Sequence, residues 1–471
     1  MPLAKLITPK KINLLGVFRT SLSLILIAFF FPAFSQDNSP YTRYGLGDIV
    51  PNTNINARGM GGISAGYNDL LSINFNNPAS YGSFQAIREL KSKRLRSGRA
   101  ILDLGVNIEN RTLIDPSKTG NFKASNALFS HLQVGVPLRS NWGLSFGLRP
   151  VSRISYKMIK NERLIDPDSG LPIDSSSTLN EGDGGSYLAS VGIGHRFIIN
   201  DKQSISFGTN VGYMFGKKDY SSRRTLINDT VQYNSGNFQT KTTFGNLYFN
   251  MGLQYQVQLD SSTVFTFGAF GNLNQTMNGS QDLVRETFFY DANAGNVRID
   301  SVYEKTGTKG KIELPSSYTA GFTIQRVPQN KKGGWLIGVD FSQTNWEKYR
   351  FYGQRDSVQN KWEIRVGGEL RPSLSSARKN YFGNVAYRAG FFFGPDYIKV
   401  KEKLPVFGAT FGLGLPLRNF NRQTPWQATM INLAFEYIKR GNNSNLLKEN
   451  MFRISVGFSL SDFWFVRKQY E

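Results

Sequence analysis

The chain has 471 residues, a formal net charge of +22, 13% aromatic residues and no cysteine. The absence of cysteine excludes a disulfide framework and thiolate chemistry. A basic balance can indicate nucleic-acid binding, but the cations are scattered through the whole sequence and are not gathered on one helix. The mean hydropathy of −0.33 and the 47 glycines suit a curved sheet that is apolar on one face.

The N-terminus is typical of an export signal. Four basic residues precede an apolar stretch: Lys5, Lys10, Lys11 and Arg19. The apolar core from Leu22 to Phe31 is followed by a small-residue cleavage pattern at Ala33-Phe34-Ser35. A spanning helix needs about 20 apolar residues, so the alternative of an uncleaved anchor helix is disfavoured. We expect residues 1–35 to be a signal peptide, and no later apolar run is long enough for a helical span.

Residues 36–99 differ in composition from the rest of the chain. They are rich in glycine and asparagine, as in Gly59–Gly62 and Asn74–Asn77, and they show no long alternation. A basic run from Lys91 to Arg99 ends them. We expect this piece to form a plug, or hatch, inside the lumen of a barrel formed by residues 100–471.

Residues 100–471 repeat alternating apolar and polar residues, each time followed by a turn or a polar loop. Period two places the apolar set on one face of a strand and the polar set on the other. Strands of soluble sheets average about five or six residues, and these are longer, so a soluble sandwich is the disfavoured alternative. We predict an all-β fold, a transmembrane antiparallel barrel of about 14 strands with an N-terminal hatch. The expected strands are 100–111, 127–138, 142–157, 184–199, 203–221, 237–259, 262–280, 309–327, 333–349, 359–372, 381–398, 404–418, 426–440 and 450–468.

The connections between these strands alternate in length over the first eight. Short connections follow the second, fourth and sixth strands, and long ones follow the others: 112–126, 158–183, 222–236 and 281–308. Short periplasmic turns and long outer loops are expected of outer-membrane barrels. Aromatic residues near strand ends predict interfacial girdles: Trp142, Tyr156, Trp335, Trp346, Tyr349, Trp362, Trp426, Tyr437 and Trp464.

Three stretches, taken in order, resemble the FadL family of outer-membrane transporters for long-chain fatty acids and other hydrophobic compounds. The residues are Ala57–Gly62 with Asn76–Tyr81; Leu314–Gly321 with Asp340 and Thr344–Trp346; and Arg365–Glu369 with Tyr387–Gly390 and Phe411–Gly414. The resemblance implies a fourteen-strand barrel with an N-terminal hatch. Its hatch motif falls on Arg58, Gly59, Gly61, Gly62, Asn77, Pro78 and Ala79. The opening Ser39–Gly45 departs from the family's usual start.

The alternation also predicts which charged side chains point into the lumen. The set is His131, Arg149, Arg196, Asp340, Glu363, Arg365, Glu369, Arg388, Glu436 and Arg453. Charges of both signs on a lumen face brace strands and hold a plug; alternatively, some of the arginines bind a ligand carboxylate through their bidentate donor fork. Arg388 is expected to pair with Glu369 on the neighbouring strand.

Catalysis is disfavoured. The chain has two histidines, and the alternation places His131 in the lumen and His195 toward lipid. No Gly-x-Ser-x-Gly elbow is present, and no cluster has metal-ligand spacing. A Ser-His or Asp-His site on His131 is the remaining enzymatic alternative, and we expect no cofactor and no metal.

The sequence therefore predicts passive uptake of hydrophobic small molecules, of the long-chain fatty acid kind, across the outer membrane of a Gram-negative bacterium. The expected surroundings are outer-membrane lipid and lipopolysaccharide, and no nucleic acid. The alternative is a FadL-like barrel that does not transport and acts as a structural subunit of an envelope assembly, for protein secretion or outer-membrane protein insertion, with partner proteins.

Overall fold

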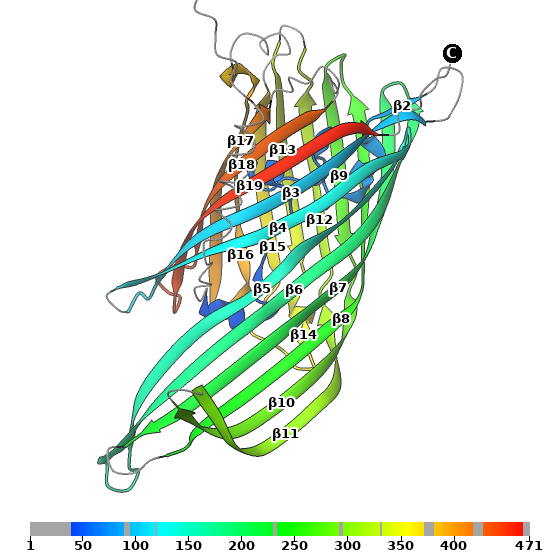
Figure 1. The fold of residues 1–471 in the computed structure, drawn as a ribbon. Coiled ribbons are helices and arrows are strands. Elements are labelled where there is room, and N and C mark those ends of the chain that lie inside the picture. The colour runs from blue at the N-terminus through cyan, green and yellow to red at the C-terminus, as the bar shows by residue number, and fades with distance from the viewer. Residues whose placement is uncertain are drawn as a thin grey trace, which may run out of the picture. The chain divides into compact units, whose positions relative to one another are not determined.

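The chain forms a closed antiparallel barrel of fourteen strands, which confirms the predicted fold class (Figure 1). The computed structural model describes residues 39–88, 95–117, 120–228, 233–291, 295–329, 332–371, 381–417 and 427–464. The predicted signal peptide lies outside these residues. The barrel closes because β19 (Lys448–Trp464) pairs with β3 (Leu95–Ile114) from Lys448 opposite Ile114 to Trp464 opposite Gly98.

The wall runs in sequence order around the barrel. The remaining wall elements are β4 (Asn121–Arg139), β5 (Trp142–Ile165), β6 (Pro172–Asn200), β7 (Gln203–Ile227), β8 (Ser235–Gln258), β9 (Thr263–Asn272), β10 (Gln275–Asp291), β11 (Gly295–Leu314), β12 (Ser317–Arg326), β13 (Gly334–Thr344), β15 (Lys361–Arg371), β16 (Ala386–Val400), β17 (Glu402–Leu417) and β18 (Ala428–Arg440). Elements β9 and β10 are two parts of one bent wall strand, because both pair with β8. Elements β11 and β12 form the next, and Pro315, which has no backbone N–H, lies at their break.

The faces of the strands follow the predicted alternation. In β3 the outward Leu104 and Ile108 are exposed, whereas the inward Asp103, Asn107 and Glu109 are buried. This is the arrangement of a barrel that is apolar toward lipid and polar inside. The predicted girdle is right for Trp142, Trp362 and Tyr437, which are exposed near strand ends.

The girdle prediction is wrong for three aromatic residues. Tyr156, Trp346 and Tyr349 are buried, and Trp346 and Tyr349 belong to a cluster of buried hydrophobic residues. The physical reason is that η3 (Trp346–Lys348) and β14 (Arg350–Phe351) pack inward, with β14 paired to β11. An aromatic residue near a strand end can face either side, and the alternation is interrupted at this turn.

One side of the barrel is much longer than the other. Strands β5 to β8, with β10 and β11, extend far beyond the end of the remaining wall, as Figure 1 shows at the bottom of the view. The long loops predicted at 158–183, 222–236 and 281–308 are therefore largely wrong, because most of these residues continue the flanking strands as hairpins. Loop 112–126 is shortened in the same way by β3 and β4. Their polar composition reflects strands with water on both faces.

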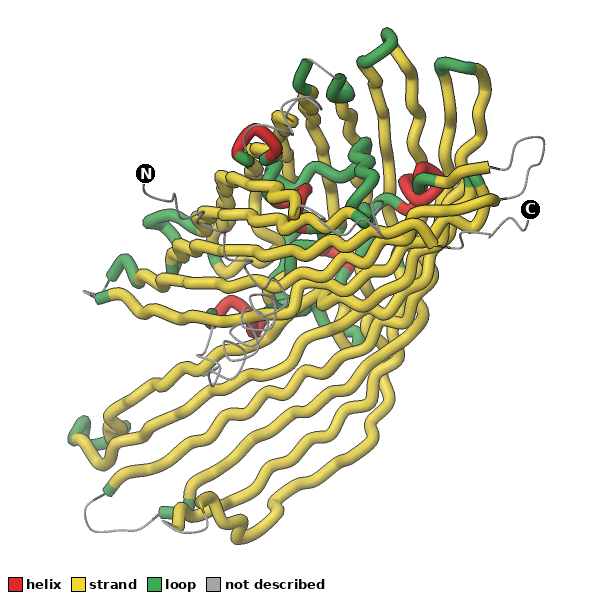
Figure 2. The backbone as a smooth tube through the Cα atoms, turned by 45° about the horizontal axis from the view of Figure 1, so that its top comes forward, coloured by secondary structure: helices red, strands yellow, loops and turns green. Residues whose placement is uncertain are grey.

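Short helical elements and two short strands precede the wall. They are η1 (Pro40–Arg43), β1 (Asp48–Ile49), α2 (Ile55–Arg58), η2 (Pro78–Ser83) and β2 (Ala86–Arg88). A further short helix, η5 (Phe382–Asn384), precedes β16. In Figure 2 the helices and loops of the first group lie within the ring of strands. We call residues 39–84 the N-terminal segment.

Candidate functional site

The N-terminal segment fills much of the lumen. Met60, Ile63, Ala65 and Tyr67 have no exposed surface, and η2 packs against β5, β6, β7 and β8 while α2 packs against β17, β18 and β19. The segment therefore touches opposite sides of the barrel at once. This is the position expected of a hatch.

Arg58 anchors the segment to the wall. Its Nη1 donates to Asn107 Oδ1 at 2.5 Å, and its Nη2 donates to Ser130 Oγ at 2.9 Å. It also donates to the backbone carbonyl groups of Thr53 and Pro51. Burial lowers the pKa of Arg58 to about 10, and neutral oxygens satisfy the guanidinium instead of a bound carboxylate.

The glycines of the hatch motif allow close backbone contact with the wall. A Cβ on Gly59 would lie 2.9 Å from Gly412 Cα, and one on Gly61 would lie 2.7 Å from the carbonyl oxygen of Val366. Gly61 and Gly62 also have φ values of +67° and +85°, which L-residues with side chains rarely adopt. The predicted motif thus lies where the chain passes the wall most tightly.

Asn77, Pro78 and Ala79 form the start of η2. The Asn77 side chain accepts a hydrogen bond from Ala79 N–H, and its Nδ2 donates to the carbonyl oxygens of Ala65 and Leu253, at 2.8 and 3.2 Å. Pro78 occupies the first helical position, where its missing N–H is not needed. Asn77 therefore links two turns of the segment to β8.

Most predicted lumen charges are brought together in ion pairs. Arg388 Nε lies 2.6 Å from Glu369 Oε2, so Arg388 pairs with the residue that was predicted to be its partner. Its Nη1 also donates to Asn432. Arg453 bridges Glu436 and Glu109, both at 2.7 Å. These groups brace neighbouring strands.

Three further predicted lumen residues also have partners. Arg365 pairs with Glu363 at 2.5 Å. Asp340 accepts hydrogen bonds from the backbone N–H groups of Ser64 and Ala65, at 2.6 and 2.9 Å, so it holds the N-terminal segment. Arg196 donates to Ser204 in the next strand.

His131 sits in a constellation that resembles a catalytic one. Ser130 Oγ lies 3.0 Å from His131 Nδ1, and Asp103 Oδ1 lies 3.4 Å from Nε2. All three side chains are buried, and Arg58 also donates to Ser130. The lumen cavity described below is not lined by Ser130 or His131, so this group is a bracing contact.

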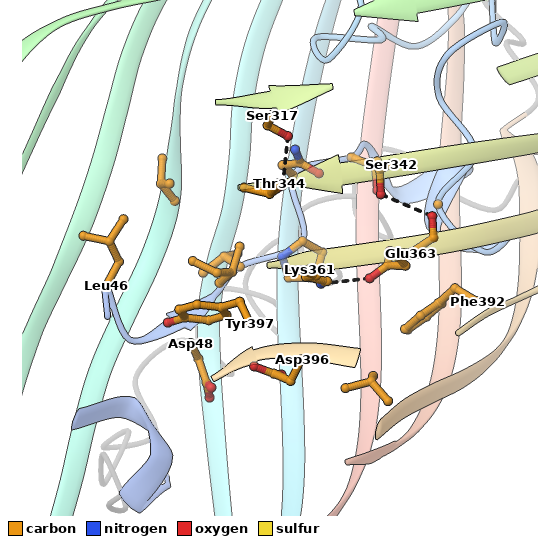
Figure 3. A pocket seen from close by; sticks show the side chains of 18 of the residues that line it. Leu46, Asp48, Ser317, Ser342, Thr344, Lys361, Glu363, Phe392, Asp396 and Tyr397 are labelled. Carbon is orange, nitrogen blue, oxygen red and sulfur yellow. Dashed lines mark hydrogen bonds and ion pairs between the residues drawn. The ribbon is translucent and has the colours of Figure 1, made fainter. Parts of the chain in front are cut away.

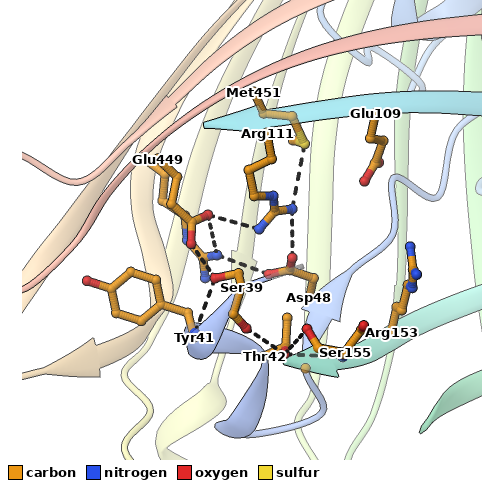
Figure 4. Close-up of polar contacts among 12 residues, drawn as sticks. Ser39, Tyr41, Thr42, Asp48, Glu109, Arg111, Arg153, Ser155, Glu449 and Met451 are labelled. Atoms are coloured by element: carbon orange, nitrogen blue, oxygen red, sulfur yellow. Dashed lines mark hydrogen bonds and ion pairs between the residues drawn. The ribbon is translucent and has the colours of Figure 1, made fainter. Parts of the chain in front are cut away.

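The sequence analysis did not find a second charge cluster, which ties the segment to β3, β18 and β19 (Figure 4). Asp48 lies 2.7 Å from Arg111 and 3.0 Å from Arg440, and Glu449 lies 2.9 Å from Arg111. Ser39 donates to the same Glu449 carboxylate. Burial raises the pKa of Asp48, but Arg111 and Arg440 outweigh burial and hold that pKa below its usual value. Arg111 and Arg440 lie at the ends of the predicted strands 100–111 and 426–440. The alternation of apolar and polar residues does not indicate that these two side chains lie close together.

The barrel wall is broken between β4 and β5. Their pairing runs from Arg139 opposite Trp142 to Leu132 opposite Leu148 and then stops. Pro150, which cannot donate to a ladder, lies just beyond this point. Within the described residues, 121–131 of β4 pair with β3 alone, and 149–165 of β5 pair with β6. Figure 1 shows the two strands diverging.

The N-terminal segment occupies this wall break. In β1, Asp48 and Ile49 pair with Arg153 and Ser152 of β5. Two backbone hydrogen bonds extend the contact, from Val50 N–H to the Val151 carbonyl at 3.0 Å and from Ser39 N–H to the Ser155 carbonyl at 3.2 Å. The exposed edge of β5 is therefore covered by the same segment that fills the lumen.

A cavity of about 360 Å³ lies between the segment and the wall (Figure 3). Its lining includes Leu128 and Val151, so it reaches the wall break. The part lined by β6 to β11 is apolar: Leu188, Met214, Tyr248, Phe270 and Leu314. The part lined by β3, β18 and β19 carries the charge clusters, and Figure 3 shows Lys361 and Glu363 paired at a further side.

Arg149 differs from the other arginines of the lumen. It is buried, it lines the cavity beside the wall break, and its Nη1 donates to the Asn52 carbonyl at 3.1 Å and to Asn76 Oδ1 at 3.4 Å. Its guanidinium lies 5.1 Å from the centre of the Phe75 ring. No carboxylate among the described residues pairs with it. Arg58 also lines the cavity without a carboxylate partner, but it donates through Nε, Nη1 and Nη2 to five acceptors of the segment and the wall. An amphipathic cavity with a cation such as Arg149 suits a hydrophobic anion.

The described ranges contain no group of three or more His, Cys, Asp or Glu placed to hold a metal ion. No helix in this part of the chain is long and apolar enough to cross a membrane.

Comparison with known proteins gives a family and a fold. A family model described as BamG matches residues 17–471. The crystal structure of a Pseudomonas aeruginosa FadL homologue is 12% identical and has a TM-score of 0.50, covering 89% of this chain and 100% of that one. The FadL-type fold implied by the ordered motifs is thereby confirmed.

Two hydrocarbon channels are also similar, with lower scores. The CymD monoaromatic hydrocarbon channel is 14% identical, with a TM-score of 0.47 and coverage of 90% of this chain and 100% of that one. The Pseudomonas putida toluene transporter TodX is 14% identical, with a TM-score of 0.47 and coverage of 88% and 99%. No curated protein matches the sequence.

Proposed function

Because the chain belongs to the BamG family and has a FadL-type fold, we propose that it is an outer-membrane channel for passive passage of hydrophobic small molecules that carry a carboxylate, such as long-chain fatty acids. The observation that carries the proposal is the amphipathic cavity beside the wall break. It combines an apolar side with a buried Arg149 that has no carboxylate partner among the described residues. Its volume of about 360 Å³ falls in the range of about 300–1,000 Å³ typical of ligand sites.

The orientation follows from the turns. The short turns and the C-terminal strand end face the periplasm, and the long hairpins face outward, as in barrels of this class. The cleaved signal peptide directs export, and the apolar outer band contacts membrane lipid and lipopolysaccharide. Residues 36–99 act as the hatch.

The route combines the cavity with the wall break. A ligand enters from the outer end, and its carboxylate binds Arg149 while its apolar part lies against Leu188 and Met214. Movement of β1 away from β5 opens the wall break and releases the ligand sideways. The backbone contact to be broken consists of the two paired residues of β1 and the hydrogen bonds of Val50 and Ser39, and the Asp48 ion pairs with Arg111 and Arg440 oppose the movement.

The proposal is tested by the affinities of a long-chain fatty acid and the corresponding alcohol for purified protein in detergent. In Arg149→Gln, affinity for the acid should fall roughly 10- to 100-fold, since a hydrogen bond to a charged group contributes about 1.5–3 kcal/mol. The alcohol should bind as before. Arg196→Gln, which removes an inward arginine outside the cavity lining, is the matched control. Equal loss of acid and alcohol binding, or no loss, would contradict the proposal.

A second function is favoured by a different observation. The N-terminal segment is held by buried ion pairs at Asp48 and by Arg58, which suits a barrel that stays closed and serves as a structural subunit of an envelope assembly. Gentle purification from membranes separates the two functions. Stoichiometric partner proteins together with no fatty-acid binding would favour the structural subunit.

A further inference from the structure

The part of the wall that projects beyond the rest has two chemically different faces. We call it the extended wall: residues 157–183 of β5 and β6, 217–228 and 233–243 of β7 and β8, and 281–291 and 295–308 of β10 and β11. On its outward face, cations and carboxylates form ion pairs, four of them across strands and Arg298–Glu304 within β11. The pairs are Lys157–Glu181 at 3.5 Å, Lys217–Asp183 at 2.6 Å, Arg223–Glu181 at 2.5 Å, Arg298–Glu286 at 3.2 Å and Arg298–Glu304 at 3.1 Å.

The opposite face is the one that continues the lumen surface. Lys218 marks it, because its Nζ donates to Tyr349 Oη at 3.2 Å inside the barrel. In β7 the residues two apart share this face, so Tyr220, Ser222 and Arg224 follow Lys218. The regular register of β7 with β8 places Phe238 opposite Ser222. We call this the inner face.

The register carries the inner face across to β10 and β11. Phe238 lies opposite Arg285, and Arg285 lies opposite Tyr303. The Arg285 guanidinium is 5.8 Å from the centres of both rings, which confirms that the three side chains share one face. Lys305, opposite Leu283, belongs to the same face one row nearer the barrel.

Three cations of the inner face, Arg224, Arg285 and Lys305, differ from those of the outward face because they have no ion-pair partners among the described residues, whereas Lys160 on the same face pairs with Glu162. Arg224, Arg285 and Lys305 are exposed, and Phe238 and Tyr303 are 52% and 45% exposed. The register puts three carboxylates of the described residues on this face. Asp300 forms no ion pair among them, Glu162 pairs with Lys160, and Asp174 accepts a hydrogen bond from Asn228. A surface of three unpaired cations around two open rings is unbalanced in charge and rich in the residue types of interfaces.

We propose that the inner face of the extended wall, formed by Arg224, Phe238, Arg285, Tyr303 and Lys305, docks an acidic protein at the outer side of the membrane. Charge complementarity carries the choice of partner. Arg224, Arg285 and Lys305 have no ion pair among the described residues, whereas Glu162 on the same face is already paired with Lys160 and Asp174 is hydrogen-bonded to Asn228. The inference uses the proposed orientation and not the proposed transport, and it would supply a partner for the second function.

The geometry favours a protein over a small ligand. Small molecules are bound in concave pockets that cover most of their surface. The rings of Phe238 in β8 and Tyr303 in β11 are instead exposed, on either side of Arg285 in β10. Exposed Arg, Tyr and Phe are also the residue types over-represented in protein interfaces. Unpaired cations at the rim of such an interface raise the rate of association with an acidic partner.

The test uses the purified full-length protein and fluorescent poly-glutamate of defined length as the probe. Replacing Arg224, Arg285 and Lys305 together with serine should weaken binding at least roughly tenfold, as the loss of three exposed ion pairs would give. The control replaces Lys241, Lys309 and Lys311, which by register lie on the outward face, and so removes the same net charge. It should change binding less than about twofold, and added salt should weaken wild-type binding.

Two results would overturn the proposal. Equal weakening in the two triple variants would mean that net charge, and not this face, attracts the probe. Binding of polygalacturonate in preference to poly-glutamate would make the partner an acidic glycan. Phe238→Ala with Tyr303→Ala gives a readout without a charge change, and it should weaken poly-glutamate carrying interspersed tyrosines more than poly-glutamate itself.

Discussion

At the scale of single residues, the arginines of the lumen fall into two groups by their partners. Arg388 and Arg453 are saturated by carboxylates of the wall, so they brace strands. Arg58 and Arg149 are buried among neutral oxygens. Both line the cavity, but Arg58 donates through Nε, Nη1 and Nη2 to acceptors of the segment and the wall, whereas Arg149 donates through Nη1 alone in the described part of the chain. The neighbours of each arginine, and not its residue type, distinguish an arginine that braces strands from one that is proposed to bind a ligand.

Removal of a bracing arginine should affect stability and leave binding unchanged. In Arg388→Ala, Glu369 keeps its contact with Arg371, so we expect a loss of about 2–3 kcal/mol, below the ~3–5 kcal/mol of a fully broken buried pair. The measurement is the temperature at which the heat-modifiable band shifts on SDS gels. A double-mutant cycle with Glu369→Gln supplies the control. Weaker fatty-acid binding at unchanged stability would assign Arg388 to the ligand site instead.

Protonation of Asp48 should loosen the N-terminal segment at acid pH. Its folded-state pKa lies below the ordinary value because Arg111 and Arg440 outweigh burial. Such a group contributes stability above its unfolded pKa of about 3.9, and the contribution is lost as pH falls through the folded pKa. Limited proteolysis of the segment should therefore be slow from pH 7 to about 4 and faster below. In Asp48→Asn this extra protection should be absent at every pH.

At the scale of elements, the strands of the wall were predictable and the position of the N-terminal segment was only partly so. Alternation finds the fourteen strands because each has one lipid face. The alternation is absent where both faces of a strand are exposed to water, so the hairpins at 158–183 and 281–308 were predicted to be loops. The contacts of Asp48 with Arg111 and Arg440 join residues far apart in the chain, and no local pattern reports them. The sequence signal for close contact between the N-terminal segment and the wall is the presence of inward-facing glycines in the middle of strands, such as Gly367 and Gly412.

Two neighbouring glycines allow a test of the close contact between segment and wall. Alanine at Gly61 or Gly62 carries a similar conformational cost of roughly 1–2 kcal/mol, because both have positive φ. A Cβ at Gly61 would lie 2.7 Å from a wall carbonyl, whereas at Gly62 the nearest atom is 3.5 Å away. Gly61→Ala should therefore lower stability by a further ~1–3 kcal/mol. Equal melting temperatures for the two variants would show that the segment does not press against the wall there.

At the scale of the whole molecule, the barrel is asymmetric in two related ways. Strands β5 to β11 project outward on one side, and the wall is broken where that side begins, between β4 and β5. The N-terminal segment joins both features, because it lines the cavity and pairs with the exposed edge of β5. In the proposed route, passage through the lumen and sideways release therefore depend on one small element, β1.

The most direct measurement of the proposed passage locks β1 to β5. The chain has no cysteine, so Ile49→Cys with Ser152→Cys, which are register partners, introduces one disulfide at the wall break. The control pair, Thr209→Cys with Met251→Cys, joins register partners of β7 and β8 away from it. Uptake of a labelled long-chain fatty acid by cells should be slow with the oxidised lock, recover on reduction, and stay normal with the control. Equal uptake by the oxidised and reduced lock would contradict release through the wall.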